Sequence, residues 1–326
     1  MTNNNELTEM NLIKMSDIEA KEVEWLWYPF IPYGKLTIIQ GDPGDGKTTL
    51  VLNIAAALTQ GKGFENGMNV EEPMNVIYQT AEDGLADTVK PRLEQAGAEC
   101  SKVLVIDESE KSLSMTDERI EKALDETGAR LLIMDPIQAY LGGGTDMNRA
   151  NEAREITKHL AIIAEKKNCA IVLIGHMNKA GGIKAAYRGM GSIDFIAVAR
   201  SVLLVGRVPG IDNRRAVIQI KNNLAPMGHA KAFDLSEDGF EWIGNYEISA
   251  EDVLGGYSYK ESKLDQAKQL FRELAKNKDR ISSLELIELA KTEGISKRTM
   301  DTAKKELGIK SIKVNNTWYL KLDEKM

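Results

Sequence analysis

One segment of the chain carries the residue types and spacing needed to hold a triphosphate. The pattern G-x-x-x-x-G-K-[ST] is matched by Gly41, Asp42, Pro43, Gly44, Asp45, Gly46, Lys47 and Thr48, and Thr49 follows it directly. Glycines let backbone N–H groups wrap phosphate oxygens, and the dipole of a following helix favours the negative charge. Lys47 can reach the β- and γ-phosphates, while the Thr48 hydroxyl can ligate Mg²⁺. The segment therefore predicts a site for ATP and magnesium.

Two carboxylates supply the remaining parts of a hydrolytic site. Asp135 ends the apolar run Leu131–Met134, which predicts a carboxylate at the carboxyl edge of a sheet, where it can hold the hydration shell of magnesium. Pro136 follows Asp135, so the group that activates water must come from another strand. The run Val76–Gln79 leads to Glu82, a placement that resembles the RecA/DnaB arrangement, and this resemblance implies that Glu82 orients and deprotonates water. The alternative for Glu82 is a solvated acid at the start of a helix.

A histidine ends a third apolar run. His176 follows Ala170–Ile174 and Gly175, a position from which its side chain can sense the γ-phosphate. The next loop, Met177–Asp194, is basic, rich in glycine and longer than a purely structural connection needs. We expect His176 to pass the state of the phosphate to this loop; a structural histidine is the alternative.

The elements that must position these residues follow from short apolar runs that alternate with helix-length segments. Buried strands are predicted at Leu36–Gln40, Val76–Gln79, Val103–Ile106, Leu131–Met134, Ala170–Ile174, Val202–Val205 and Ala216–Ile220. Helices are predicted at Thr49–Gln60, Asp87–Ala96 and Ala150–Lys166. Continuously apolar strands alternating with helices are typical of an α/β fold, a mainly parallel sheet sandwiched by helices. The aromatic cluster Trp25–Phe30 is expected to pack under the first strand.

The sequence changes character after this alternation ends near Phe240–Trp242. Residues 246–259 lack a strong period and predict a linker. An amphipathic helix is expected around Leu264–Leu274, and serines at 282 or 283 and at 296 can cap two more. Alternating residues on either side of Asn315-Asn316 then predict a hairpin. We interpret residues 260–326 as a winged-helix-like domain, after a flexible lead-in at 1–20 and an ATPase domain at 21–245.

Composition narrows the classes of protein that fit. The formal net charge of −7 argues against a uniformly basic surface that coats nucleic acid. From Lys260 onward, however, 16 Lys and Arg residues stand against 11 Asp and Glu, a net charge of +5. Two cysteines without metal-ligand spacing fit a reduced compartment. No apolar run of membrane-spanning length and no signal-peptide pattern is present, so we expect a cytoplasmic protein without membrane contact.

Taken together, these motifs resemble the RepA-type branch of the RecA/DnaB-like P-loop ATPases, replicative helicases of plasmids, phages and integrative elements. The match covers roughly residues 20–245, with order and spacing preserved. It is carried by the Trp25–Gly34 lead-in, the Gly41–Thr48 loop, Ala81-Glu82-Asp83, Arg92-Leu93, Asp135-Pro136, Gly175-His176, Arg188–Ser192 and Lys221-Asn222-Asn223.

The resemblance implies a RecA-like fold and a homo-oligomer, usually a hexameric ring, with ATP between neighbouring subunits and single-stranded DNA in the centre. It also implies a cationic finger that reaches the neighbour's γ-phosphate, a position that Lys221 matches. Asn223 stands where such helicases have a second cation, so Arg188 and Arg207 become candidates for the missing charge. Arg92 is similar to the residue that stacks on adenine in this branch, and a plain surface arginine is the alternative.

Nucleic acid could be held in two places. In this architecture the loops Leu141–Asn151 and Met177–Asp194 point to the central channel, where cations contact the DNA backbone without sequence preference. Their candidates are Arg149, Lys179 and Lys184. In the C-terminal domain, a third helix could present basic residues to duplex DNA, namely Lys297, Arg298 and Lys304. Simple solvation of these cations is the alternative in both places.

These observations predict an ATP-hydrolysing, nucleic-acid-dependent translocase or helicase that acts in DNA replication as a ring. One alternative is a RecA/RadA-like recombination ATPase, built from the same core as an open filament. Another is a nucleotide-switched DNA-binding regulator. A small-molecule phosphotransferase fits poorly, because the chain lacks an arginine-rich lid-like insertion.

Overall fold

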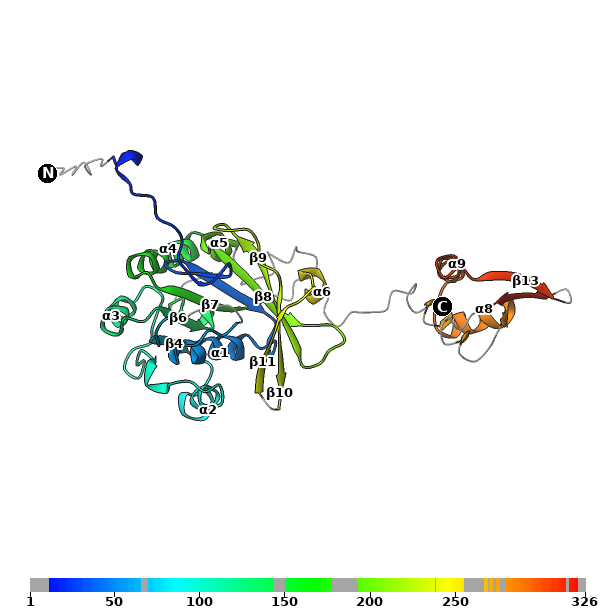
Figure 1. The fold of residues 1–326 in the computed structure, drawn as a ribbon, viewed down its shortest axis with the longest axis horizontal. Coiled ribbons are helices and arrows are strands. Elements are labelled where there is room, and N and C mark those ends of the chain that lie inside the picture. Colours follow the sequence, from blue (N-terminus) through cyan, green and yellow to red (C-terminus); the bar gives the residue numbers. More distant parts are fainter. Residues whose placement is uncertain are drawn as a thin grey trace, which may run out of the picture. The chain divides into compact units, whose positions relative to one another are not determined.

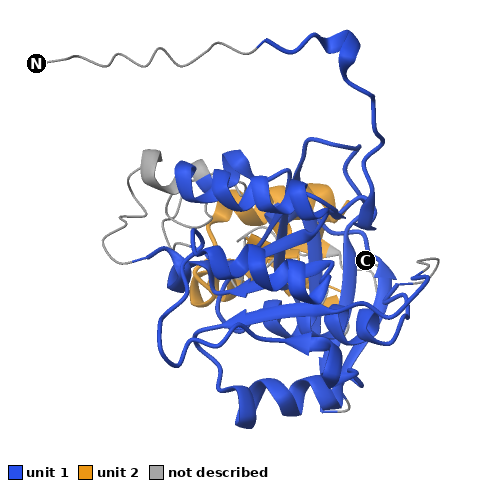
Figure 2. Cartoon of the chain, turned by 90° about the vertical axis from the view of Figure 1, so that its left-hand side faces the viewer, with its two compact units in different colours: residues 1–251 blue, residues 252–326 orange. Residues whose placement is uncertain are grey.

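The computed structural model describes residues 12–65, 70–142, 150–177, 193–237, 239–254, 280–314 and 317–321, and positions 267, 268, 270, 271, 274 and 275. The chain forms two compact units, residues 1–251 and residues 252–326 (Figure 2). The predicted domain boundaries stay predictions, and the short helix α6 (Ala250–Leu254) lies within the segment proposed as a linker. Among the described residues, none of the helices combines the length and the apolar character needed to cross a membrane.

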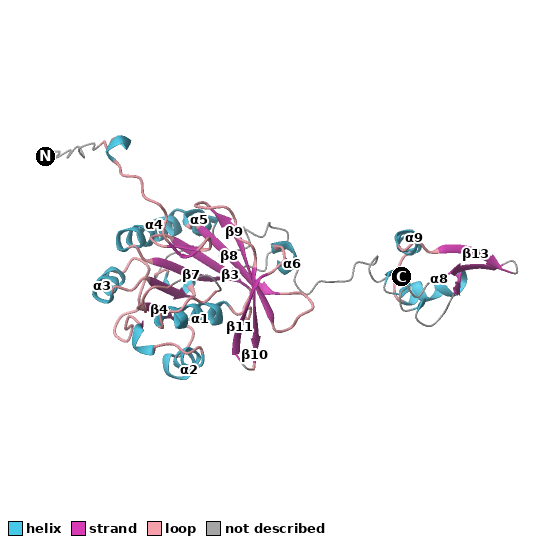
Figure 3. Cartoon of the chain, in the orientation of Figure 1, coloured by secondary structure: helices cyan, strands magenta, loops and turns pink. Residues whose placement is uncertain are grey.

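A single sheet organises the described part of the first unit (Figures 1 and 3). Its strand order is β11-β10-β9-β8-β3-β7-β6-β4-β5, and the strands from β8 to β5 are parallel. The strands are β3 (Leu36–Gly41), β4 (Val76–Thr80), β5 (Val103–Leu104), β6 (Leu131–Asp135), β7 (Ala170–His176), β8 (Ser201–Arg207), β9 (Arg214–Asn222), β10 (Lys231–Ser236) and β11 (Gly239–Asn245). The last three strands run antiparallel to their neighbours.

Helices cover both faces of this sheet. Successive side chains of a strand point to opposite sides, so each strand contributes to the apolar clusters on both faces. In β6, Leu132 and Met134 pack into one apolar cluster with residues of α3 (Glu118–Thr127) and α4 (Ala150–Lys167). Leu131 and Ile133 pack into the other cluster, with α1 (Lys47–Thr59) and α2 (Lys90–Gln95). The predicted α/β architecture is confirmed: a mixed, mostly parallel central sheet with flanking helices.

Several boundaries differ from the prediction. The strand expected at 103–106 spans two residues, and the helix expected at 87–96 begins with a π-helical turn, η2 (Leu85–Val89). A short helix, α5 (Ile193–Val198), precedes β8. The hairpin β10–β11 was not predicted at all, although Asp238-Gly239 between alternating apolar residues is a strong hairpin signal.

The aromatic cluster near the start of the chain packs into the sheet's core. It forms a two-stranded ribbon, β1 (Trp25–Trp27) and β2 (Ile31–Pro32), after a short exposed 3-10 turn, η1 (Met15–Asp17). Trp27 and Phe30 are buried, and Trp27 contacts the ring of Trp242 on β11. The ribbon therefore packs against β11 and shares an apolar cluster with residues of β3, the strand that leads into the predicted phosphate loop.

The described part of the second unit combines helices with a three-stranded antiparallel sheet. Its described elements are β12 (Arg280–Ser282), α8 (Ser283–Thr292), α9 (Lys297–Glu306), β13 (Lys310–Val314) and β14 (Thr317–Lys321), and the strand order is β12-β14-β13. Ser282 and Ser296 accept backbone N–H groups at the starts of the helices, as predicted. The described positions between 267 and 275 are helical, and β12 was not foreseen. The winged-helix assignment itself stays a prediction, and the Asn315-Asn316 turn lies outside the described residues.

Candidate nucleotide-binding site

The predicted phosphate-binding loop joins β3 to α1 as expected. Gly46 has φ +89°, a left-handed conformation in which a β-carbon is strained. At Gly41 a β-carbon would lie 2.1 Å from the carbonyl oxygen of Val205 on β8, so only glycine fits between the two strands. Glycine at positions 41 and 46 thus permits a tight strand-to-helix turn, and Asp42, Pro43 and Gly44 at its top are exposed.

Lys47 lies inside this loop. Its side chain is buried, and its ammonium group donates hydrogen bonds to the carbonyl oxygens of Gly41, at 2.9 Å, and Asp42, at 2.8 Å. Burial lowers the pKa of Lys47, and the carboxylates of Asp45 and Asp135 oppose that shift. A cation held against the loop by backbone carbonyls is suited to receive an anion there, because charge-assisted hydrogen bonds to phosphate oxygens are strong.

Asp45 turns back into the loop. It accepts the Asp42 N–H at 3.0 Å, and its Oδ1 lies 3.6 Å from Nε of Arg207 at the end of β8. Burial raises the pKa of Asp45, and the Asp42 hydrogen bond opposes the rise. The structure therefore gives Asp45 a role in shaping the loop, beside the contact with nucleotide that the motif predicts.

Thr48 and Asp135 meet as a magnesium site requires. The Thr48 hydroxyl donates to Oδ2 of Asp135 at 2.7 Å, from the first turn of α1 to the end of β6. Asp135 is 6% exposed, and burial raises its pKa while hydrogen bonds from Thr48 and Tyr78 lower it. A hydroxyl and a carboxylate are the hard oxygen ligands that Mg²⁺ prefers, usually together with phosphates and water. These two residues fit magnesium.

Strand register brings the other predicted catalytic residues to the same edge of the sheet. Gly41 is paired with His176 across β3 and β7, and Thr80 is paired with Asp135 across β4 and β6. Glu82 follows Thr80, and one of its oxygens lies 3.8 Å from Nε2 of His176. The Glu82 side chain is 61% exposed, and its charge also acts on Lys47 and Asp135. Glu82 is therefore accessible to water and close to the phosphate loop.

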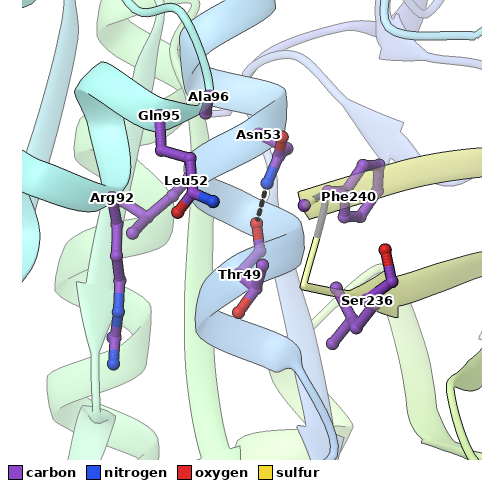
Figure 4. A pocket seen from close by; sticks show the side chains of 10 residues that line it. Thr49, Leu52, Asn53, Arg92, Gln95, Ala96, Ser236 and Phe240 are labelled. Atoms are coloured by element: carbon purple, nitrogen blue, oxygen red, sulfur yellow. Dashed lines mark hydrogen bonds between the residues drawn. The ribbon is translucent and has the colours of Figure 1, made fainter.

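Arg92 lines a pocket beside the phosphate loop (Figure 4). The pocket has a volume of about 370 Å³ and lies between α1, α2 and the β10–β11 hairpin. Arg92 Nη1 pairs with Asp83 at 2.8 Å, which holds the guanidinium near the end of β4. The other lining residues are Thr49, Leu52, Asn53, Gln95, Ala96, Leu235, Ser236, Gly239 and Phe240. A mixed apolar and amide lining next to a phosphate loop suits a nucleotide base.

The sequence of the chain matches a known family over the part that builds most of this site. Residues 6–182, more than half of the chain, match the family described as an AAA domain. The chain belongs to the AAA domain family.

Relatives of this AAA domain chain include repair proteins. The DNA repair protein RadA of Halalkalibacterium halodurans is 27% identical over 246 residues, which are 74% of this chain and 48% of that protein. The DNA repair protein RadA of Bacillus subtilis is 30% identical over 154 residues, 46% of this chain and 29% of that protein. The chain thus spans less than half the length of these relatives. Among solved structures, the crystal structure of the RadB recombinase has 19% identity and a TM-score of 0.45, covering 67% of this chain and 93% of that one.

Two of the predicted finger residues of this AAA domain chain are engaged with the chain itself. Arg207 stands at the end of β8, and a β-carbon on Gly44 would lie 3.7 Å from its Nη2, so Arg207 borders its own phosphate loop. Lys221 lies near the end of the antiparallel strand β9, in register with Val202, and thus at the opposite edge of the sheet. Its ammonium group donates to the carbonyl oxygens of Ile196, Ala197 and Ala199, where α5 ends. Of the two, only Lys221 is placed where it cannot reach its own loop.

Sequence reasoning missed two parts of the site. The first is the β10–β11 wall of the pocket that Arg92 lines, which the Asp238-Gly239 signal could have revealed. The second is Tyr78 on β4, whose hydroxyl donates to Oδ2 of Asp135 at 3.1 Å. Nothing in the sequence around Tyr78 marks this contact, because it depends on the register of β4 with β6.

Only some of the predicted nucleic-acid contacts fall on residues that the structure describes. Arg149, Lys179 and Lys184, and the candidate finger Arg188, lie outside the described residues. In the second unit, Lys297 and Arg298 are exposed in the first turn of α9. Lys304 is half-buried and donates to the Ser311 hydroxyl at 2.6 Å. The exposed pair at the helix start therefore stays the better candidate for contact with phosphates.

Proposed function

We propose that the protein is a magnesium-dependent ATPase whose hydrolysis is coupled to DNA, in the manner of a RadA-like recombination ATPase. The observation that carries this proposal is the meeting of Thr48 and Asp135 at 2.7 Å, beside the buried Lys47. Glu82 on the adjoining strand supplies a carboxylate at the same edge. Few arrangements other than a nucleoside triphosphate site bring these four groups together.

Each residue has a defined task in this proposal. Main-chain N–H groups of Gly41–Thr48 hold the phosphates, and Lys47 neutralises charge on the β- and γ-phosphates. Thr48 and Asp135 would hold magnesium, which would supply positive charge to stabilise the transferring phosphate. Glu82 accepts a proton from the water that attacks the γ-phosphorus. His176 ends β7, and its Nε2 lies 3.8 Å from the Glu82 carboxylate. A movement of Glu82 would therefore be transmitted through His176 to Met177, the next residue.

The base pocket supports ATP as the nucleotide. Arg92 borders the pocket, and its guanidinium can stack on a purine ring. The side-chain amides of Asn53 and Gln95 offer donor and acceptor groups to a base edge. Asn53 also donates to the carbonyl oxygen of Thr49 at 2.9 Å, which fixes the position of its amide (Figure 4).

The role in recombination is supported by the similarity to proteins named DNA repair protein RadA. The sequence motifs alone favour a replicative helicase, and the relatives favour the recombination alternative. In both cases DNA is the partner, held by loops that carry Arg149, Lys179 and Lys184 and, in the second unit, by the start of α9. Ring or filament assembly belongs to the same proposal, because Lys221 can complete only a neighbour's site.

Hydrolysis of ATP with and without single-stranded DNA tests the catalytic part. We expect Lys47→Ala to abolish turnover, and Glu82→Gln to retain nucleotide while lowering kcat by about 10²–10⁴-fold, the usual contribution of a general base. Normal hydrolysis by the Glu82→Gln variant would refute the assignment of the catalytic carboxylate. Glu94→Gln is the control, because Glu94 is an exposed acid that pairs with Lys90 and lies outside the pocket lining.

Two further measurements separate the biological roles. ATP-dependent unwinding of forked DNA would favour the helicase, whereas strand exchange or branch extension without unwinding would favour the recombination ATPase. Electron microscopy with an ATP analogue and an oligonucleotide distinguishes closed rings from open filaments.

A further inference from the structure

A tyrosine that is absent from every motif contacts the predicted magnesium ligand. Tyr78 lies in the middle of β4 and has no exposed surface. Its hydroxyl donates to Oδ2 of Asp135 at 3.1 Å, and the Thr48 hydroxyl donates to the same oxygen at 2.7 Å. Two donors from two different elements therefore converge on one oxygen of one carboxylate.

The sheet explains why these groups meet. Strands β4 and β6 are parallel neighbours, with Tyr78 in register with Ile133 and Thr80 in register with Asp135. Tyr78 shares its apolar cluster with Ile133 and with residues of α1. From this position the long phenol side chain reaches toward the carboxyl edge, where its hydroxyl finds Asp135. A shorter side chain at position 78 would fill the core without reaching the carboxylate.

Tyr78 is the donor in this hydrogen bond. A phenol hydroxyl keeps its proton throughout the physiological range, so Tyr78 can donate to the carboxylate. Asp135 is itself buried, and a buried polar group needs hydrogen-bond partners. Tyr78 thus supplies one of the two side-chain hydrogen bonds that hold the Asp135 carboxylate in place.

We infer that Tyr78 is a positioning residue for magnesium, because its hydroxyl fixes the Asp135 carboxylate against Thr48 before nucleotide arrives. With both donors on Oδ2, the lone pairs of Oδ1 remain for the hydration shell of the ion. The inference rests on the proposed nucleotide site. Residues that orient metal ligands typically change metal affinity by about 10–100-fold when they are removed.

The chain offers a matched control for the loss of one buried phenol hydroxyl. Tyr140 ends the short helix η4 (Ile137–Tyr140), five residues after Asp135, and is 1% exposed. Within the part of the chain that the structure describes, its hydroxyl has no hydrogen-bond partner. Tyr78→Phe and Tyr140→Phe therefore remove the same atom from similar surroundings, and only the first removes a bond to Asp135.

The test measures how much magnesium improves nucleotide binding, without relying on turnover. A fluorescent ATP analogue is titrated into the 326-residue protein in Mg²⁺ and in EDTA. The ratio of the Kd in EDTA to the Kd in Mg²⁺ is then compared between the wild type and the variants. We expect Tyr78→Phe to lower this ratio about tenfold or more, with the Kd in EDTA nearly unchanged. Tyr140→Phe should keep the wild-type ratio. An unchanged ratio in Tyr78→Phe, or equal losses in both variants, would overturn the inference.

A second variant separates positioning from a general loss of packing. If Tyr78 acts through Asp135, Tyr78→Phe should have little further effect on the ratio when Asp135 is already Asn. An additive loss in the double variant would show that Tyr78 acts by another route. Failure of the wild-type protein to bind the analogue in either condition would refute the proposed nucleotide site itself. Binding that tightens with Mg²⁺ in the wild type, and equally in Tyr78→Phe, would refute only the role of Tyr78.

Discussion

Replacement of Lys221 by methionine should destabilise the isolated first unit. The Lys221 ammonium lies 2.7 Å from the carbonyl oxygen of Ile196, 3.1 Å from that of Ala197 and 2.7 Å from that of Ala199. These carbonyls belong to the end of α5, where a helix leaves its last C=O groups without partners in the chain. Methionine keeps the length of the side chain and removes all three bonds.

The size of the effect follows from this geometry. A hydrogen bond from a charged donor contributes about 1.5–3 kcal/mol, and a cation at a helix C-terminus contributes up to ~2 kcal/mol when it is partly buried. Lys221 is only half-buried, so water can replace part of what is lost. We therefore expect Lys221→Met to lower the free energy of unfolding by about 2 kcal/mol. For a unit of this size that corresponds to a decrease in Tm of roughly 4–8 °C.

Thermal and urea unfolding without nucleotide, followed by tryptophan fluorescence, would measure this loss. Trp25, Trp27 and Trp242 all lie in the first unit and report on it. Lys122→Met is the control, because Lys122 pairs with Glu126 on the exposed face of α3, where such a pair contributes about 0.3–0.5 kcal/mol. Equal stability of the Lys221→Met and Lys122→Met variants would refute the capping role.

The same variant bears on the finger hypothesis. A lysine that reaches a neighbour's γ-phosphate must first release the three carbonyls of α5, so phosphate binding and the end of α5 would be coupled. Lys221→Met should then slow hydrolysis only in assemblies. Mixing it with Glu82→Gln subunits should restore some turnover at hybrid interfaces, and no recovery would count against action on a neighbour.

Two further predictions concern the base pocket and the start of α3. Arg92→Gln should weaken ATP binding about fivefold with little change in kcat, because ~1 kcal/mol of cation–π stacking is lost. Lys90→Gln is the control, because Lys90 lies on the same helix but outside the pocket lining, and this variant should bind ATP normally. Isothermal titration would compare the two Kd values. Hydrogen bonds from Arg119 hold the pKa of Asp117, the N-cap of α3, well below its usual range. A lowered carboxyl pKa adds stability that is complete above the unfolded value of about 3.9 and is lost as pH falls toward the folded value. Urea unfolding should therefore show Asp117→Ala about 1 kcal/mol less stable at pH 7, with the gap closing below pH ~4; a gap that persists in acid would contradict the cause.

Local sequence determined the chemistry and the elements that carry it. The glycine spacing of residues 41–48 fixes a strand-to-helix turn, and uninterrupted apolar runs such as Leu131–Met134 fix strands buried on both faces. Ser282 and Ser296 fix the starts of α8 and α9, because their hydroxyls accept backbone N–H groups that a helix start leaves free. Each of these predictions depends only on residues close together in the chain.

Tertiary structure alone decided which of these residues meet. The pairing of Thr80 with Asp135 places Tyr78 within reach of the metal ligand, and the antiparallel turn into β9 sends Lys221 to the opposite edge from Arg207. The β10–β11 hairpin folds back to close the base pocket over α1 and α2. A strand's period of two tells which face a side chain occupies, but strand order and register tell which neighbour it finds there. Those depend on contacts between segments that lie tens of residues apart in the chain.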